Sequence, residues 1–507
     1  MLLREVVETA AVVAGTRSRL AKVEALAGLL RRLDPEEVEP ATGFLVGRAR
    51  QGRVGIGWRG LAGGMAEPAA DASLSVHDFD ALLDTVVATS GTGSAARRTA
   101  ALRELTGRAT ATEQDFIRRV LLGEIRTGAL EGVLVDAVAA AAGLPGDLVR
   151  RAVMLSGDLG GTARLALGGE PGALEAVGLA VFVPVLPMLA STAPDPRAAL
   201  AMTGRASVEF KLDGARIQVH RRGGQVRVFT RSLADVTRRL PEIVDVVTRF
   251  PGGDLIIDGE TLSLQEDGSP RPFQDTMSRF GAEGPRSQVL RPWFFDVLHA
   301  DGVDLIDRPL AQRLGVLAAV AGDHRVPGVV TDDPAVAERL SGEALAAGHE
   351  GIVVKGVDSR YAAGRRGRAW VKAKPVHTYD LVVLGAEWGS GRRAGWLSNL
   401  HLGALDPEGE FGQAGDFVMV GKTFKGLTDE LLRWQTERFP QIERRRTRAA
   451  VFVEPVVVVE VAIDGVQKSS RYPGGIALRF ARVKRYREDK RAEEADTIQT
   501  LRSRLPV

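Results

Sequence analysis

The chain has 507 residues, of which 45% are hydrophobic, 26% are charged and 5% are aromatic. This length exceeds what one hydrophobic core usually serves and predicts about three domains. The composition excludes a wholly disordered or fibrous chain, and the absence of cysteine excludes disulfides and thiolate zinc sites. No apolar run reaches the roughly 18 residues of a membrane span, and the N-terminus lacks the basic region of an export signal. We therefore expect a cytoplasmic protein.

The formal net charge is +3, but the charges are unevenly distributed. Residues 441–507 contain 15 basic and 9 acidic side chains, which favours a polyanionic partner, although a solvated charged surface has the same composition. Only 10 of the 67 lysines and arginines are lysine, and nine of these lie from Lys211 onward. Where arginine is the usual cation, a lysine can indicate a site that needs an amine able to lose its proton.

Helical periodicity dominates residues 1–187, which we predict to form an all-α domain. Apolar residues recur at helical spacing through 1–33, 79–89, 95–106, 112–122 and 130–142. Asp34 and Pro35 predict the start of a further helix, because proline suits the first helical turn. A proline-rich stretch with Pro184, Pro187 and Pro194 then indicates a linker.

Short strands become the main pattern after this linker. Residues 188–375 are predicted to form an α+β domain, with strands at 207–211, 215–221, 225–230, 255–264, 293–298 and 351–355 and helices at 234–248, 310–319 and 334–347. In residues 376–507, strands at 381–386, 397–405, 417–420 and 451–463 predict a small β-barrel.

Two glycine-rich sequences resemble nucleotide-binding loops but fail in context. Gly55 to Gly60 matches G-x-G-x-x-G, yet it lies among predicted helices without a preceding strand, so a tight loop is the simpler interpretation. The GKT sequence at 421–423 resembles the end of a P-loop, but Asp416 stands where the motif needs its first glycine. We expect Lys422 to be a surface residue or to face a polyanion.

The segment from Glu209 to Arg216, EFKLDGAR, has the sharpest chemical pattern. Lys211 lies where a predicted strand ends and an Asp-Gly turn leads into the next, so its amine can be presented rigidly. An amine is a nucleophile only when deprotonated, and nearby cations would lower its pKa because they disfavour the ammonium form. The candidate cations are Lys355, Arg366, Lys372 and Lys374. Taken alone, K-x-D-G is more typical of a solvent-exposed turn lysine.

Further ordered motifs make the chain resemble the covalent nucleotidyltransferases, which include ATP-dependent DNA ligases, RNA ligases and mRNA capping enzymes. The counterparts are KLDGAR at 211–216, TRS at 230–232, IDGE at 257–260, WFFDV at 293–297, EGIVVK at 350–355, WVKAK at 370–374, RFAR at 479–482 and REDK at 487–490. Within this group the chain is most similar to ATP-dependent DNA ligases of the archaeal and actinobacterial type. Ala481 departs from the family pattern, which usually has proline there.

The resemblance extends over essentially the whole chain. It implies an N-terminal helical DNA-binding domain, a nucleotidyltransferase (adenylation) domain and a C-terminal β-barrel OB-fold. This plan agrees with the boundaries predicted from the sequence, at 1–187, 188–375 and 376–507.

The family reaction that the resemblance implies has three steps. Lys211 attacks the α-phosphorus of ATP and becomes linked to AMP, AMP passes to the 5′-phosphate of a DNA nick, and the 3′-hydroxyl displaces AMP. Phe295 would stack on the base, and Arg479 in the C-terminal domain would help to close that domain over ATP. Mg²⁺, with Mn²⁺ as an alternative, would bind Glu260 and Glu350. Nucleotide contacts are implied for Glu209, Arg216, Arg231, Glu260, Phe295, Lys355, Arg366, Lys372, Lys374, Arg482, Arg487 and Lys490.

The implied partner is nicked duplex DNA, which a monomer in the nucleoid would encircle and bind through its backbone without reading bases. Candidate contacts in the helical domain are Arg97, Arg98, Arg118 and Arg119. A GTP-using capping-type enzyme would not need that domain, and an NAD-dependent ligase normally carries a four-cysteine zinc module. An RNA ligase would share the motifs as well. A non-catalytic nick-binding clamp would share the architecture, although the intact Lys211 opposes the clamp.

Overall fold

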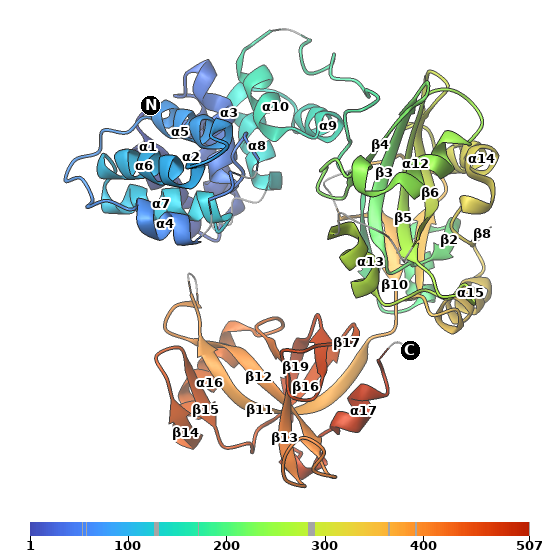
Figure 1. The fold of residues 1–507 in the computed structure, drawn as a ribbon. Helices are drawn as coiled ribbons and strands as arrows, with labels where there is room; N and C mark the ends of the chain where they lie inside the picture. Colours follow the sequence, from blue (N-terminus) through green and yellow to red (C-terminus); the bar gives the residue numbers. More distant parts are fainter. Residues whose placement is uncertain are drawn as a thin grey trace.

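The computed structural model describes residues 1–52, 54–56, 58–125, 131–170, 172–281, 289–362, 366–390 and 393–505. Three bodies lie around an open centre in Figure 1: a helical body in blue to cyan, an α+β body in green to yellow, and a β-rich body in orange to red. The predicted fold class is confirmed. Within the described ranges, no helix is long and apolar enough to cross a membrane.

The described part of the N-terminal body consists of helices. The expected helix over 1–33 is two helices, because Thr16 is extended (φ −109°, ψ 147°) and the Ser18 side chain caps a new start. Their apolar faces share one core, in which the rings of Phe44 and Phe79 lie 4.6 Å apart. The helices are α1 (Leu3–Gly15), α2 (Arg19–Leu30), α3 (Pro35–Leu45), α4 (Trp58–Gly64), α5 (Val76–Ala88), α6 (Ser94–Gly107), α7 (Ala111–Leu122), α8 (Glu131–Ala142), α9 (Gly146–Ser156) and α10 (Leu159–Leu167).

The central body contains two five-stranded sheets, ordered β1-β10-β9-β2-β8 and β4-β3-β5-β6-β7. Its strands are β1 (Leu189–Ala193), β2 (Ala206–Phe210), β3 (Ala215–Arg222), β4 (Gln225–Thr230), β5 (Leu255–Ser263), β6 (Leu290–Ala300), β7 (Val303–Asp304), β8 (Gly328–Thr331), β9 (Ile352–Gly356) and β10 (Arg366–Ala373). Its helices are α11 (Pro196–Thr203), α12 (Pro241–Thr248), α13 (Phe273–Gly281), α14 (Leu310–Ala321) and α15 (Pro334–Ala346). The helix expected over 234–248 begins only at Pro241, since proline lacks an N–H donor and suits a first turn.

The C-terminal body has a seven-stranded sheet that curves into a half-barrel, together with the β17–β18 hairpin. The strand expected over 451–463 is two strands, because Pro455 falls between β15 and β16 and cannot donate to a ladder. The strands are β11 (His377–Trp388), β12 (Leu397–Asp406), β13 (Asp416–Thr423), β14 (Glu443–Arg446), β15 (Ala450–Val453), β16 (Val458–Ile463), β17 (Gly465–Lys468), β18 (Ile476–Arg479) and β19 (Arg482–Tyr486). Helices α16 (Asp429–Arg438) and α17 (Ile498–Arg502) complete it.

Neither glycine-rich sequence forms a nucleotide-binding loop. Helix α3 rather than a strand precedes the G-x-G-x-x-G match, and α4 begins inside it at Trp58, while residues 53 and 57 lie outside the described residues. The GKT sequence ends strand β13, and Lys422 forms an ion pair with Glu387 on β11.

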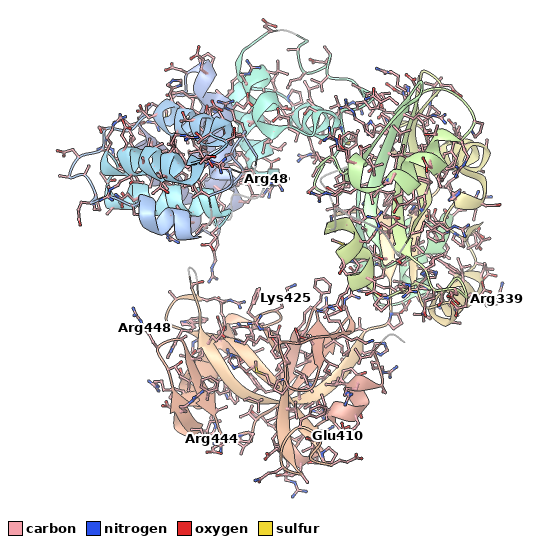
Figure 2. All side chains as sticks on the ribbon, in the orientation of Figure 1. Arg48, Arg339, Glu410, Lys425, Arg444 and Arg448 are labelled. Atoms are coloured by element: carbon pink, nitrogen blue, oxygen red, sulfur yellow. The ribbon has the colours of Figure 1, made fainter. Side chains whose placement is uncertain are left out.

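Ion pairs connect the helical body with each of the other two bodies. Arg151 of α9 pairs with Asp307 of the central body at 2.6 Å, and Arg17 of the helical body pairs with Asp429 of α16 at 2.9 Å. Figure 2 shows Arg48 and Lys425 extending toward the space between the bodies. The arrangement therefore brings basic side chains from both ends of the chain to one central space.

Candidate active site

Lys211 follows the last residue of β2 and is fixed through its backbone. Its N–H donates to the carbonyl oxygen of Gly351 at 2.8 Å, and its own carbonyl oxygen accepts the N–H of Glu350 at 3.0 Å. Gly351 has a φ of +131°, and a Cβ there would lie 2.5 Å from the carbonyl oxygen of Ala373. Only glycine fits this approach, which brings the ends of β2, β9 and β10 together at the lysine.

Carboxylates, not cations, dominate the field at the Lys211 amine. Burial lowers its pKa, but the ion pair with Glu350 and the nearby Glu260 and Asp213 raise the pKa by more, so that it lies above its ordinary value. The expectation that cations lower it is therefore wrong for this conformation, because the ε-ammonium is paired. The pKa of Lys372 does lie below its ordinary value, because burial and the positive charges of Lys211 and Lys374 lower it.

Glu260 lies on β5 directly opposite Arg216 on β3. Burial raises the pKa of Glu260 to about 7, against the opposing fields of Lys211 and Arg216. Two predicted metal ligands, Glu260 and Glu350, thus act on one amine. The structure brings their charges together at this amine, and their part in metal binding stays a prediction.

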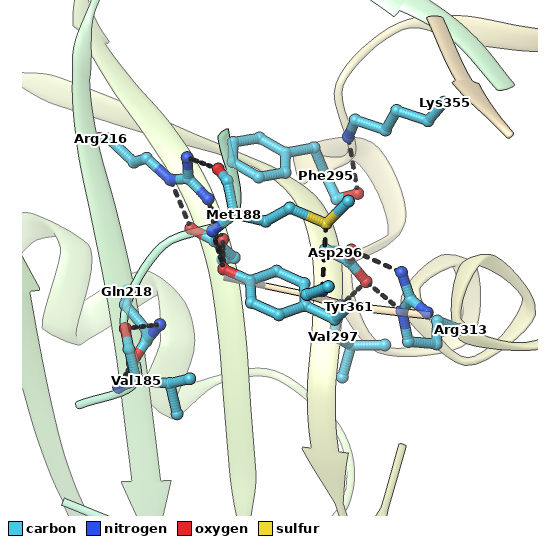
Figure 3. Close-up of polar contacts among 12 residues, drawn as sticks. Val185, Met188, Arg216, Gln218, Phe295, Asp296, Val297, Arg313, Lys355 and Tyr361 are labelled. Atoms are coloured by element: carbon cyan, nitrogen blue, oxygen red, sulfur yellow. Dashed lines mark hydrogen bonds and ion pairs between the residues drawn. The ribbon is translucent and has the colours of Figure 1, made fainter. Parts of the chain in front are cut away.

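Glu209 and Lys355 form a buried ion pair behind the lysine. The Glu209 carboxylate accepts the Ser207 hydroxyl at 2.7 Å and the Lys355 ammonium at 2.5 Å. The Lys355 Nζ lies 4.3 Å from the centre of the Phe295 ring (both residues are drawn in Figure 3). It lies 4.4 Å from the centre of the Trp370 ring. Because Lys355 is only 2% exposed, it holds the Glu209 and Phe295 region together in this conformation rather than presenting its amine to solvent. A cavity of about 60 Å³ borders Glu209 and Phe295 and is lined elsewhere by Ser207, by Arg325 and Val326, and by residues of α14 and β8.

The C-terminal body contacts this site through the ends of its β17–β18 hairpin. Arg479 donates two hydrogen bonds, at 2.6 and 3.1 Å, to Asp213, which lies two residues after Lys211. Lys374 lies 2.7 Å from Asp464 and 3.8 Å from Glu350. Asp464 also pairs with Arg482 at 3.2 Å. Sequence reasoning missed Asp464, since a single aspartate between two strands has no distinguishing pattern.

Several predicted site residues lie apart from this cluster. Arg487 and Lys490 both bond Asp380 on β11, at 2.9 and 2.6 Å, and so lie within their own domain. Arg231 is exposed just after β4. Arg366 begins β10, but its side chain lies outside the described residues.

The four arginines predicted to contact DNA have local partners in the helical body. Arg97 and Arg98 donate to backbone carbonyls of residues 89–92, the turn before α6. Arg118 and Arg119 both pair with Asp115 on α7. Their part in DNA binding stays a prediction.

Three family descriptions match the chain in the order of its bodies. Residues 64–139 match "DNA ligase N terminus", residues 187–374 match "ATP dependent DNA ligase domain", and residues 393–490 match "ATP dependent DNA ligase C terminal region". The central match includes Lys211 and the carboxylates of Glu350, Glu260 and Asp213 that raise its pKa.

Relatives of known sequence match over the full length. A probable DNA ligase of Pseudarthrobacter chlorophenolicus is 66% identical over 505 residues, and one of Rhodococcus opacus is 56% identical over 507 residues; each match covers 100% of both chains. The solved structure Pmar-Lig_PreS3 has the same fold, with a TM-score of 0.63 and 21% identity, over 96% of this chain and 100% of its own. The chain belongs to the family of ATP-dependent DNA ligases.

Proposed function

We propose that this ligase seals 5′-phosphate/3′-hydroxyl nicks in duplex DNA with Lys211 as the nucleophile that carries AMP. The observation that carries the proposal is the position of the Lys211 amine. It lies at a fixed strand end, paired with Glu350, with Glu260 and Lys372 in its field. A turn lysine in solvent would have none of these partners.

In the first step Lys211 releases the ammonium proton that it holds in this conformation, Nζ attacks the α-phosphorus of ATP, an N–P bond forms as a second proton leaves for solvent, and the bond to the leaving pyrophosphate breaks. In the second step an oxygen of the nick's 5′-phosphate attacks the same phosphorus, the N–P bond breaks, and Nζ takes up protons again. In the third step the 3′-hydroxyl attacks the 5′-phosphorus and AMP leaves. Each step gathers negative charge, which Lys372 in the field of Lys211 and Lys374 beside Glu350 would offset, while Arg216 lies opposite Glu260 on the neighbouring strand.

Magnesium suits the donor set at this site, with manganese as an alternative. Mg²⁺ usually binds one or two carboxylates together with substrate phosphates and water. The carboxylates of Glu260 and Glu350 converge on one amine, which satisfies that requirement, and within the described residues no larger cluster of metal-binding side chains occurs. When bound there, the ion would offset phosphate charge. The adenine would occupy the cavity beside Phe295 and Glu209.

We also propose that the chain acts as a monomer that encircles the nicked duplex in the bacterial nucleoid. The arrangement of the bodies in Figure 1, and the position of Arg48 and Lys425 toward their common centre in Figure 2, support this. We further propose domain limits at 1–187, 188–375 and 376–507, which the grouping of the helical, central and β-rich elements supports.

The decisive experiment incubates the full chain with labelled ATP, GTP or NAD in the presence of Mg²⁺. We expect a protein label from ATP alone that survives alkali but is released by acid and by acidic hydroxylamine, as a P–N bond requires, and its loss together with nick sealing in Lys211→Arg. The matched control is Lys484→Arg, an exposed lysine of β19, which should label and seal normally. Labelling by GTP would indicate a capping-type enzyme, and nick binding without any label would indicate a clamp.

A further inference from the structure

The segment that enters from the helical domain runs along one face of strand β3. Three polar side chains of β3, at positions 216, 218 and 220, point to that face because alternate residues of a strand share a side. His220 is fully buried and Gln218 is 5% exposed, while the side chain of Arg216 is 15% exposed. Buried polar groups of this kind need partners, and here the partners are backbone atoms of the entering segment.

Each of the three side chains binds a different residue of that segment. The N–H of Phe182 donates to Nδ1 of His220 at 2.9 Å. Val185 donates its N–H to Gln218 Oε1 at 2.8 Å and accepts from Gln218 Nε2 at 3.2 Å. Arg216 donates from Nη1 to the Met188 carbonyl oxygen at 2.6 Å, as Figure 3 shows. The strand therefore fixes residues 182–188 through their main chain.

Tyr361 holds the same segment from the other side. Its hydroxyl accepts the N–H of Met188 at 3.0 Å and donates to Oδ2 of Asp258 at 2.8 Å (Figure 3). The thioether of Met188 accepts the N–H of Ala362 at 3.4 Å. All three polar atoms of Met188 thus have partners, and the Tyr361 hydroxyl joins Met188 to Asp258.

Asp258 in turn sets the orientation of Arg216. The carboxylate, 1% exposed, accepts Nε at 3.1 Å and Nη2 at 2.6 Å, so that the planar guanidinium has one bidentate orientation. Nη2 also lies 3.3 Å from the Tyr361 oxygen. An arginine has five N–H donors, and these contacts leave one, on Nη1, for a ligand. The ring of Phe295 lies 5.3 Å from the guanidinium carbon.

The entering segment is also bound to the helical domain. Leu186 donates its N–H to the carbonyl oxygen of Met154 on α9 at 3.0 Å. Side chains from α9, from the segment and from around Tyr361 and Trp370 share one buried apolar cluster. A shift of α9 relative to the central domain would therefore displace the main chain near Met188.

We propose that Tyr361 is a positioning residue for the ligase reaction. Through Asp258 it fixes the guanidinium of Arg216, and through Met188 it couples that guanidinium to the segment that carries the helical DNA-binding domain. This inference rests on the nucleotide-contact role proposed above for Arg216. The proposed role depends on the hydroxyl of Tyr361 alone. Tyr361→Phe removes this hydroxyl and keeps the ring that packs against Trp370.

The test is a double-mutant cycle in the full chain with Tyr361→Phe, Arg216→Ala and the two combined. Single-turnover sealing of a pre-adenylated nick should slow by about 10-fold to about 100-fold in Tyr361→Phe, because a displaced contact group costs rate. The KM for nicked DNA should stay within about twofold. In the Arg216→Ala background, adding Tyr361→Phe should change nothing further. Amide hydrogen exchange of Met188 should become faster in Tyr361→Phe, since its acceptor is gone.

The matched control is Tyr379→Phe, which removes another buried tyrosyl hydroxyl, bonded to Arg504 in the C-terminal domain, and should leave sealing unchanged. If Arg216→Ala seals at the normal rate, the role proposed for Arg216 fails and the inference fails with it. If Arg216→Ala is slow but Tyr361→Phe is normal, or if the two effects multiply, the inference alone is overturned. A rise in KM without a slower rate would also overturn it.

Discussion

Arg313 and Asp296 form an ion pair in which both side chains are 0% exposed. Asp296 directly follows Phe295, the residue predicted to stack on the base. Arg313 donates to the carboxylate at 2.7 and 3.0 Å and to the carbonyl oxygens of Arg308 and Ser359 at 2.6 and 2.9 Å. In Arg313→Met, the buried carboxylate and two carbonyls lose these partners. Breaking such a pair costs about 3–5 kcal/mol. For a domain of this size, each kcal/mol lowers the melting temperature by about 2–4 °C, so we expect a fall of roughly 10 °C.

Calorimetry of the full chain, with the central-domain transition followed separately, measures this fall. Arg197→Met provides the matched control, because Arg197 and Glu338 of the same domain form an exposed pair at 3.2 Å, which is worth at most about 1 kcal/mol. Replacing both buried partners, in Arg313→Met with Asp296→Leu, should recover much of the loss, since no unpaired charge remains. A single variant that melts within 2 °C of the unaltered protein, by the roughly 2–4 °C scale above, would refute the assignment of that cost.

Two further predictions concern the C-terminal domain and the entering segment. Lys490 bonds Asp380, away from Lys211, so the C-terminal domain must reorient before Lys490 can act in self-adenylation. Lys490→Ala should therefore slow self-adenylation far more than it slows sealing of pre-adenylated nicks. Equal losses in the two assays would contradict this. Burial, with a smaller effect from His299, lowers the pKa of His220 to about 3. Its stabilising effect is complete above the unfolded pKa of about 6.5 and is lost as pH falls from there toward the folded value, about 2 kcal/mol of it by pH 5. Denaturant titrations at pH 7.5 and pH 5 should show a smaller pH-dependent loss in His220→Gln, and an identical loss would count against the prediction.

Local sequence patterns predicted most of the secondary structure. Helical spacing located α5 to α8, and alternation located β3, β4 and β5, because both signals arise within a few residues of one another. The misplaced boundaries have local causes that single residues supply, such as the break at Pro455. The fold brings the charges of Glu260, from within β5, and Glu350, just before β9, to the amine of Lys211.

The sequence did not predict which partners the charged side chains bind. Lys355, expected to contact the nucleotide, is paired with Glu209, and Arg487 and Lys490 are paired with Asp380. Tyr361 and Asp464 carried no signal in the sequence, although each bonds residues central to the proposed site. A motif specifies which chemical group is available, but not which opposite charge lies nearest to it.

By itself, the sequence determined the three-part architecture and the family, because these follow from periodicity, spacing and residue type along the chain. The tertiary structure decided the protonation environment of Lys211, the contact of Arg479 with Asp213 and the grip of β3 on the entering segment. These depend on atoms that lie far apart in sequence, 266 residues in the case of Arg479 and Asp213. Coulombic and hydrogen-bond energies depend on distance in space, so only the folded chain sets them.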